Sequence, residues 1–227
     1  MKQRPILFST PMVQAILDGR KTMTRRIMKP QPWVFSQPDN GIEDPAHEEW
    51  NWPIPKSEFK GEAIGMISHP SAFYKYCPYG QPGDVLWVRE GFAPFVGMIR
   101  QPRDYKYKAD NNALHKDVKW KPSIHMPKSA CRLFLEVASV KVERLQDITE
   151  SDAIAEGIES DPLGPVEIHD HEELFYKNYQ FPESKFRYVD AKKSFASLWM
   201  SIHGSESWNQ NPWVWVIEFK RNEWPQL

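Results

Sequence analysis

The stretch from residue 132 to residue 145 constrains the fold more than any other part of the chain. Its apolar residues alternate with polar ones but change phase halfway, with Leu133, Leu135 and Val137 before the change and Val140 and Val142 after it. Alternation with a period of two is typical of a strand. The change of phase near Ala138 and Ser139 indicates one extra residue, a bulge, which bends the strand. A long bent strand favours a small closed β-barrel, because closing a sheet requires such bends.

Shorter segments complete the predicted fold. Period-two patterns and turn signals predict further strands at residues 6–9, near 63–68, and at 85–90, 105–108 and 213–220. Caps and apolar stripes predict helices at residues 10–19, 149–156, 171–179 and 191–203. Strands and helices do not alternate regularly, as an open α/β sheet would require. The prediction is an α+β chain in which short helices flank a small mixed β-barrel.

The length of 227 residues favours one domain that carries long connections. Prolines are concentrated between residues 30 and 82, where we expect a long, mostly irregular insertion. A helical excursion is expected at about residues 158–204. Together these segments give a single domain over residues 1–227.

Local caps define the expected helix ends. Thr10 is the expected N-cap of the first helix, and Thr149 with Asp152 resembles a capping box. Asp190 and Gly204 are expected to begin and end the last long helix. The buried stripe of that helix is predicted to comprise Ala191, Phe195, Leu198, Trp199 and Ile202.

Composition excludes several classes of protein. The formal net charge of -1 excludes a histone-like nucleic-acid binder but not a local basic site. Cys77 and Cys131 are too few for a disulfide framework, and no cysteine–histidine pattern indicates zinc. His169 and His171 bracket Asp170, but their spacing suits a strand, whereas a helix is predicted there. No apolar run is long enough to span a membrane or to act as a signal peptide. We therefore expect a cytoplasmic protein without a metal or cofactor.

One basic run stands out directly after the first predicted helix. It contains five cations and no acidic residue within ten positions: Arg20, Lys21, Arg25, Arg26 and Lys29. Thr22 and Thr24 lie between them, and cations with hydroxyls are typical of phosphate contacts. The alternative is a solvated charged loop.

Two further side chains are candidates for chemistry. Glu156 lies in the last turn of a short predicted helix, where the helix dipole disfavours a carboxylate. Buried beside a lysine it would carry a proton, whereas its alternative is a surface glutamate. His125 lies between apolar residues just before the long strand, and a core or loop histidine is the alternative there to a binding role.

Four segments together resemble the ASCH domain family, which belongs to the PUA-like β-barrels. They are AILDGRKTMTRR at 15–26, GDVLWVRE at 83–90, LQDITE at 145–150 with Ala153 and Glu156, and WVWVIEF at 213–219. CPYG at 77–80 and SIHMP at 123–127 resemble longer members common in phages and prophages. The insertion and residues 158–189 are covered least by this resemblance.

The resemblance implies a cleft that accepts a nucleoside or RNA, with no obligate protein partner. Small relatives are amidohydrolases that deacetylate N(4)-acetylcytidine with a lysine, a threonine and a glutamate. These residues fall on Lys21, Thr24 and Glu156 of this chain. The resemblance further implies substrate or RNA contacts from Arg20, Thr22, Arg25, Arg26, Glu90 and His125.

The implied chemistry needs an activated hydroxyl. Thr24 would attack the acyl carbonyl, Lys21 would take its proton, and Glu156 would deliver one to the leaving amine. Lys21 and Thr24 would face opposite sides of a regular strand, so this scheme requires irregular backbone after Gly19. A binding module without catalysis and a ribonuclease are the alternative functions.

Overall fold

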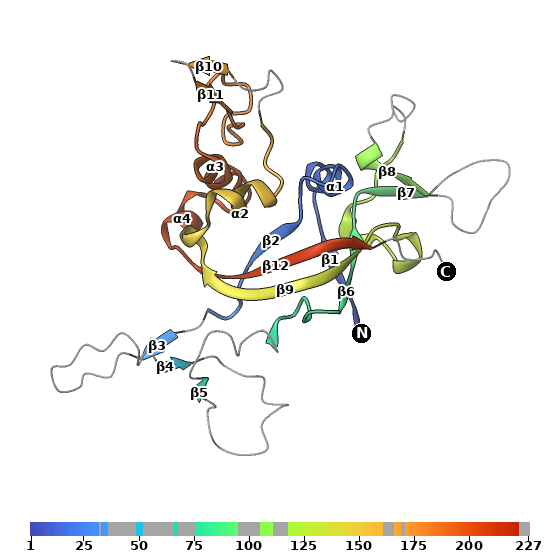
Figure 1. The fold of residues 1–227 in the computed structure, drawn as a ribbon. Helices are drawn as coiled ribbons and strands as arrows, with labels where there is room; N and C mark the ends of the chain where they lie inside the picture. Colours follow the sequence, from blue (N-terminus) through green and yellow to red (C-terminus); the bar gives the residue numbers. More distant parts are fainter. Residues whose placement is uncertain are drawn as a thin grey trace.

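The computed structural model describes residues 1–31, 33–35, 49–51, 66–67, 76–94, 105–110, 118–160, 166–168 and 171–222. Its centre is a five-stranded mixed sheet in the order β1-β6-β9-β12-β2 (Figure 1). The strands are β1 (Gln3–Leu7), β6 (Val85–Arg89), β9 (Phe134–Arg144), β12 (Trp213–Asn222) and β2 (Met23–Ile27). β1 runs parallel to β6, and the other neighbours are antiparallel. The structure thus combines a mixed sheet with a few short helices, which agrees with the coarse part of the α+β prediction.

The predicted bulge is confirmed and lies in β9. Ser139 pairs with Glu218 and Val137 pairs with Phe219, so Ala138 has no partner across the ladder. The extra residue reverses the side-chain phase, which is why the apolar alternation changes at this point. The longest strand of the sheet therefore bends where the sequence pattern slips.

The expected closed barrel is not confirmed. Within the described residues the sheet ends at β1 on one side and β2 on the other, without backbone pairing between them. One side chain spans these two edges, because Arg26 of β2 donates a hydrogen bond of 2.6 Å to the carbonyl of Leu7 in β1. The Arg26 guanidinium also lies 5.1 Å from the ring centroid of Phe8. The sheet is therefore strongly curved but open.

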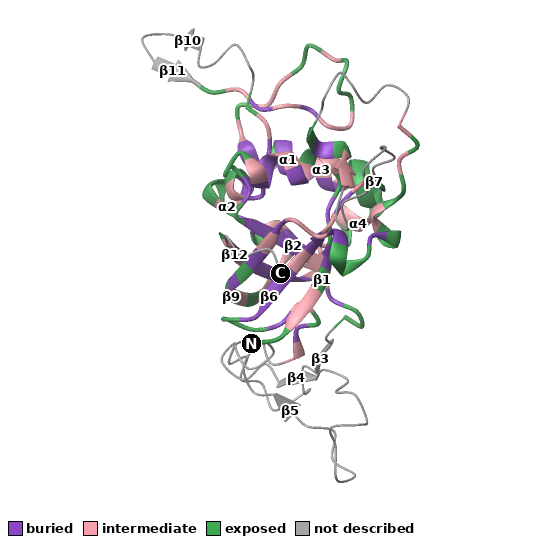
Figure 2. Cartoon of the chain, turned by 90° about the vertical axis from the view of Figure 1, so that its right-hand side faces the viewer, coloured by how far each residue is buried: buried purple, intermediate pink, exposed green. Residues whose placement is uncertain are grey.

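Three helices pack against the sheet, α1 (Thr10–Leu17) on one face of β12, and α2 (Glu150–Ala155) and α3 (Ala191–His203) on the other (Figures 1 and 2). The short helix α4 (Ser205–Asn209) follows α3 directly. The caps of α2 and α3 are confirmed, since Thr149 accepts from the backbone of Asp152 and Asp190 from that of Lys193. The expected N-cap of α1 is one residue off, because Ser9 holds that position.

Smaller elements surround this centre. The predicted insertion contains a three-stranded antiparallel sheet of β3 (Trp33–Phe35), β4 (Glu49–Asn51) and β5 (Met66–Ile67), the last within the strand expected near 63–68. β7 (Phe92–Pro94) pairs with β8 (Tyr105–Tyr107), and β10 (Val166–Ile168) with β11 (His171–Glu173). Single 3-10 turns are η4 (Lys108–Asp110), η6 (Ser123–His125), η7 (Lys128–Ala130) and η8 (Leu145–Asp147).

The helix predicted at 171–179 is wrong. Its first residues form β11, and Tyr176 makes backbone bridges to Ser160 and Tyr188 instead of continuing a helical turn. Pairing with segments 12 and 16 residues away therefore overrides the local helical pattern.

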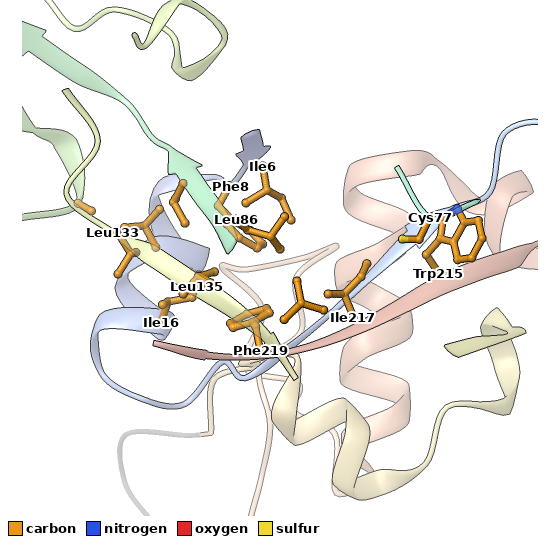
Figure 3. Packing of buried hydrophobic residues seen from close by; sticks show 14 of the residues in the cluster. Ile6, Phe8, Ile16, Cys77, Leu86, Leu133, Leu135, Trp215, Ile217 and Phe219 are labelled. Carbon is orange, nitrogen blue, oxygen red and sulfur yellow. The ribbon is translucent and has the colours of Figure 1, made fainter. Parts of the chain in front are cut away.

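The core has two parts, one on each face of β12. Trp215, Ile217 and Phe219 pack with residues from β1, α1, β6 and β9 in a cluster that Figure 3 shows from close by. Val214 and Val216 point to the other face and pack against α2 and α3. Burial of apolar side chains on both faces stabilises the fold and places the helices over the sheet. Among the described residues, no helix has the length and apolar character needed to cross a membrane.

Candidate active site

The backbone between α1 and β2 places Lys21 inside the protein. Gly19 ends α1 with a φ of 76°, a left-handed conformation that glycine adopts without strain. The Lys21 amide then donates to the carbonyl of Ala15, and the Thr22 amide donates to that of Ala155. Lys21 therefore precedes β2, so the alternation of side chains along that strand does not set the direction of its side chain. The expected chemistry with Lys21 and Thr24 required such irregular backbone after Gly19.

Glu156 faces Lys21 from the end of α2, where it is the C-cap residue. The Lys21 Nζ atom lies 2.7 Å from the Glu156 Oε2 atom and 2.7 Å from the Glu156 carbonyl oxygen. The two side chains are 1 % and 5 % exposed, so this contact is shielded from water. The predicted lysine–glutamate pair is thus brought together across 135 positions of sequence.

Burial changes the proton equilibrium of this pair. It lowers the pKa of the Lys21 ammonium; the Glu156 carboxylate opposes the shift, and the charges of Arg26 and Arg25 add to it. A lowered pKa makes the neutral amine of Lys21 easier to reach than that of an exposed lysine.

Arg25 holds the other side of the Glu156 carboxylate. Its guanidinium lies 3.5 Å from Glu156 Oε1, 2.8 Å from Asp152 Oδ2 and 2.5 Å from Glu143 Oε1. Because Arg25 is buried, these contacts fix it and limit the motion of Glu156. Glu143 and Asp152 were not predicted as site residues, and no local signal marks them, because they lie more than 100 positions from Arg25.

A pocket of about 420 Å³ opens beside this network, between α1 and α3 at the free edge of β2. Its polar floor is formed by Thr24, Arg25, Arg26 and Glu156. Lys21 is not among the lining residues and lies behind Glu156. The pocket therefore reaches Lys21 only through its carboxylate partner.

Thr24 is the hydroxyl of the predicted triad, and it lines the pocket from β2. Its side chain is buried by neighbouring atoms, and no hydrogen bond joins its hydroxyl to another described residue. An uncommitted hydroxyl beside a lysine–glutamate pair suits a nucleophile that another group must activate.

The wall opposite α1 is apolar and comes from α3. It is formed by Phe195, Leu198, Trp199 and Ile202. The sequence pattern predicted these residues as buried core. Ile202 departs from that prediction, because it is 51 % exposed at the end of α3. The apolar face of α3 thus extends beyond the core that it covers, and the part beyond the core forms the pocket wall.

The remaining predicted contacts lie elsewhere. Arg20 is exposed and pairs with Asp18 at 3.0 Å, and Thr22 is exposed; neither lines the pocket. Glu90 is buried against Arg132 at 2.9 Å, and burial raises the pKa of its carboxyl although Arg132 opposes that shift. His125 is exposed in η6. Neither Glu90 nor His125 lines the pocket.

The segment with His169 and His171, considered from the sequence as a weak metal site, has no described geometry, because His169 lies outside the described residues. Among the described residues no group of three or more potential metal ligands is present.

The pocket offers the Glu156 carboxylate backed by Lys21, the Thr24 hydroxyl and two guanidinium groups. The ion pair of Lys177 with Glu159 also lines it. No protein-family model, no curated protein and no solved structure matches this chain.

Proposed function

We propose that this chain is an amidohydrolase that removes an acyl group from the exocyclic amine of a modified cytidine. The observation that carries the proposal is the buried 2.7 Å contact between Lys21 and Glu156 beside the uncommitted hydroxyl of Thr24. The nucleophile and the acid thus border one pocket, and the base lies directly behind the acid.

The first half of the reaction starts from the neutral form of the Lys21–Glu156 pair, in which Lys21 is an amine and Glu156 is a carboxylic acid. The Thr24 hydroxyl attacks the acyl carbonyl carbon, and its proton passes to the Lys21 amine. The tetrahedral intermediate then collapses, the C–N bond breaks, and the Glu156 carboxylic acid protonates the leaving amine. The acyl group remains on Thr24 as an ester, and the pair is left as ammonium and carboxylate.

Water completes the cycle. The Glu156 carboxylate takes a proton from the water that attacks the ester carbonyl, and the Lys21 ammonium protonates the departing Thr24 oxygen. The free acid leaves, and the pair returns to amine and carboxylic acid. Each proton is accounted for, and the pair needs no exchange with solvent.

The pocket suits a flat heterocycle. Its volume of about 420 Å³ falls within the range of small-molecule sites, ~300–1,000 Å³. Aromatic and aliphatic side chains of α3 form one wall, against which a base packs by stacking. The charged floor then faces the edge of the base, where the acylated amine lies.

The family assignment forms part of the same proposal. The bulge at Ala138 and the link from Arg26 to Leu7 support a relationship with the PUA-like barrels, because both curve the sheet towards closure. We therefore infer that the chain is a long ASCH domain whose sheet is held curved by a side chain.

The direct test is incubation of the purified protein with N(4)-acetylcytidine, followed by chromatography for cytidine. We expect cytidine from the wild type and from Thr24→Ser, which keeps a hydroxyl. Thr24→Val keeps the shape without the hydroxyl and should yield none, and Lys21→Ala should also be inactive. Lys193→Ala removes an exposed lysine of α3 and serves as the control. Activity in Thr24→Val or Lys21→Ala would contradict the assigned roles.

A second function, binding of a modified base without catalysis, has one observation in its favour. Lys21 gives both observed hydrogen bonds to Glu156 and does not line the pocket, as in a purely structural ion pair. Cytidine binding by the wild type without any product, after long incubation with the acetylated nucleoside, would establish this function instead.

A further inference from the structure

Arg26 has hydrogen-bonding capacity that the protein does not use. Its terminal nitrogen donates to the carbonyl of Leu7, but its Nε atom is buried and has no hydrogen-bond partner among the described residues. A buried donor without a partner costs free energy, so such groups mark sites that a ligand or water completes. Arg26 also lines the pocket, so part of this side chain borders the space that a ligand would occupy.

The N-terminus of α1 adds positive potential to the same part of the pocket. Ser9, Pro11 and Met12 line it, and Arg26 contacts the residues just before them, Leu7 and Phe8. The Ser9 side chain does not cap the helix, and the first turn contains no acidic residue. The unpaired amides and the helix dipole therefore favour an anion here.

Two further basic residues belong to this region. His203, in the last turn of α3, lines the pocket, whereas Lys29 follows β2 and does not line it. Burial lowers the pKa of the His203 imidazole, and the charges of Arg26 and Lys29 lower it further. No acidic residue of the described chain adds to this shift. Arg26 and Lys29 thus bring positive charge towards His203, while the Glu156 carboxylate acts on Arg26.

We propose that Ser9, Arg26, Lys29 and His203 form a phosphate subsite at the mouth of the pocket, so that the ligand is a phosphorylated nucleoside rather than a free one. The identity of the base rests on the proposed function, whereas the phosphate contact does not. A phosphate supplies acceptor oxygens for the Arg26 side chain and for the α1 amides. Its charge also balances those of Arg26 and Lys29.

Calorimetric titration tests this subsite without any chemical step. The probes are cytidine and cytidine 5′-monophosphate, and the proteins are the wild type and the double variant Lys29→Gln/His203→Gln. We expect the monophosphate to bind the wild type at least about tenfold more tightly than cytidine, since a charge-assisted contact commonly gives that factor. The double variant should lose most of this difference. Lys193→Gln, which replaces an exposed lysine paired with Asp190, should retain it.

Equal affinities of the wild type for the two probes, or no binding of the monophosphate, would overturn the subsite. A difference that persists in the double variant would overturn the assignment to Lys29 and His203. These binding measurements do not depend on hydrolysis, so the phosphate subsite and the proposed reaction can be disproved independently.

A short oligocytidylate in place of the monophosphate identifies the source of the phosphate. Tighter binding of the oligomer, with a steeper salt dependence, assigns an RNA chain, and weaker binding assigns a free nucleotide.

Discussion

A buried lysine and a buried glutamate are tolerated here because each satisfies the other. Lys21 and Glu156 are almost inaccessible, and Arg25 occupies the second oxygen of the carboxylate. Charges in such surroundings are costly unless paired and hydrogen-bonded. The same arrangement that avoids this cost also keeps a proton donor and acceptor 2.7 Å apart.

A double-mutant cycle should show strong coupling within this pair. Lys21→Met and Glu156→Leu each leave one buried charge without its main partner, and each should reduce the free energy of unfolding by about 3–5 kcal/mol. The double variant removes both charges, so its loss should be at least about 2 kcal/mol smaller than the sum. Urea unfolding of the four proteins measures this coupling. Additive losses would show that the two side chains do not stabilise each other.

The lowered pKa of Lys21 predicts a pH dependence of stability. The unfolded chain keeps its lysine proton up to the ordinary lysine pKa of 10.5, while the folded chain releases it at lower pH. A depressed folded-state pKa therefore gives stability that is present above 10.5 and is lost as pH falls through the folded pKa. Relative to Lys21→Met, the wild type should gain stability as pH rises from about 8 towards that limit. Urea midpoints at several pH values test this, and a constant or shrinking difference would contradict it.

At the scale of single residues, the sequence predicted the centre of the site but not its support. Thr24 and Glu156 border the pocket and Lys21 contacts Glu156, as the motifs implied. Glu143 and Asp152 were missed, because their contacts with Arg25 depend on how β9 and α2 fold onto β2.

The helices and the segment that position Lys21 and Glu156 meet at a glycine. Gly157 follows α2 with a φ of 82°, and an added Cβ would lie 2.7 Å from the Cβ of Lys21 and 3.0 Å from that of Ala15. The end of α2, the end of α1 and Lys21 thus pack at a distance that only glycine permits. This close approach places Glu156 beside Lys21.

Gly157→Ala and Gly19→Ala form a matched pair that isolates this packing. Both glycines have a positive φ, so alanine should cost about 1 kcal/mol of backbone strain at either position. Nothing lies within 4 Å of an added Cβ at Gly19, whereas Lys21 and Ala15 would have to move at Gly157. Gly157→Ala should therefore lose more stability and most of the proposed deacylation activity. Equal losses in urea unfolding would show that the close approach has no energetic role.

Helices and strands were predicted correctly where the residues that determine them lie close together in the sequence. The cap by Thr149 depends on Asp152, three residues away, and the bulge at Ala138 follows from the alternation of one strand. The helix at 171–179 failed because backbone pairing with distant segments replaced it. The α3 stripe was predicted correctly as apolar, but sequence alone does not show that it extends past the core to form a pocket wall.

At the scale of the whole molecule, the charged centres are separate. Glu90 follows β6 and pairs with Arg132, which precedes β9 and also contacts Asp110. None of these three residues lines the pocket. This second buried pair connects the ends of two neighbouring strands and has a structural role.

Glu90→Gln should separate stability from binding. The amide keeps the shape of the carboxylate but weakens its contact with Arg132, so the free energy of unfolding should fall by about 1–3 kcal/mol. The affinity for cytidine 5′-monophosphate should stay the same, because Glu90 does not line the pocket. Calorimetry and urea unfolding on one sample measure both. Loss of affinity in the folded variant would restore the binding role that the resemblance implied.

The two walls of the pocket come from opposite ends of the chain, residues 9–12 and residues 195–203. A molecule bound between them stabilises the folded state, since unfolding of either end of the chain releases it. Its binding free energy therefore adds to the resistance of the whole protein to heat, by about 2.7 kcal/mol at a hundred times the dissociation constant. A library of nucleotides can accordingly be ranked by melting temperature alone, and the occupant of the pocket found before any reaction is observed.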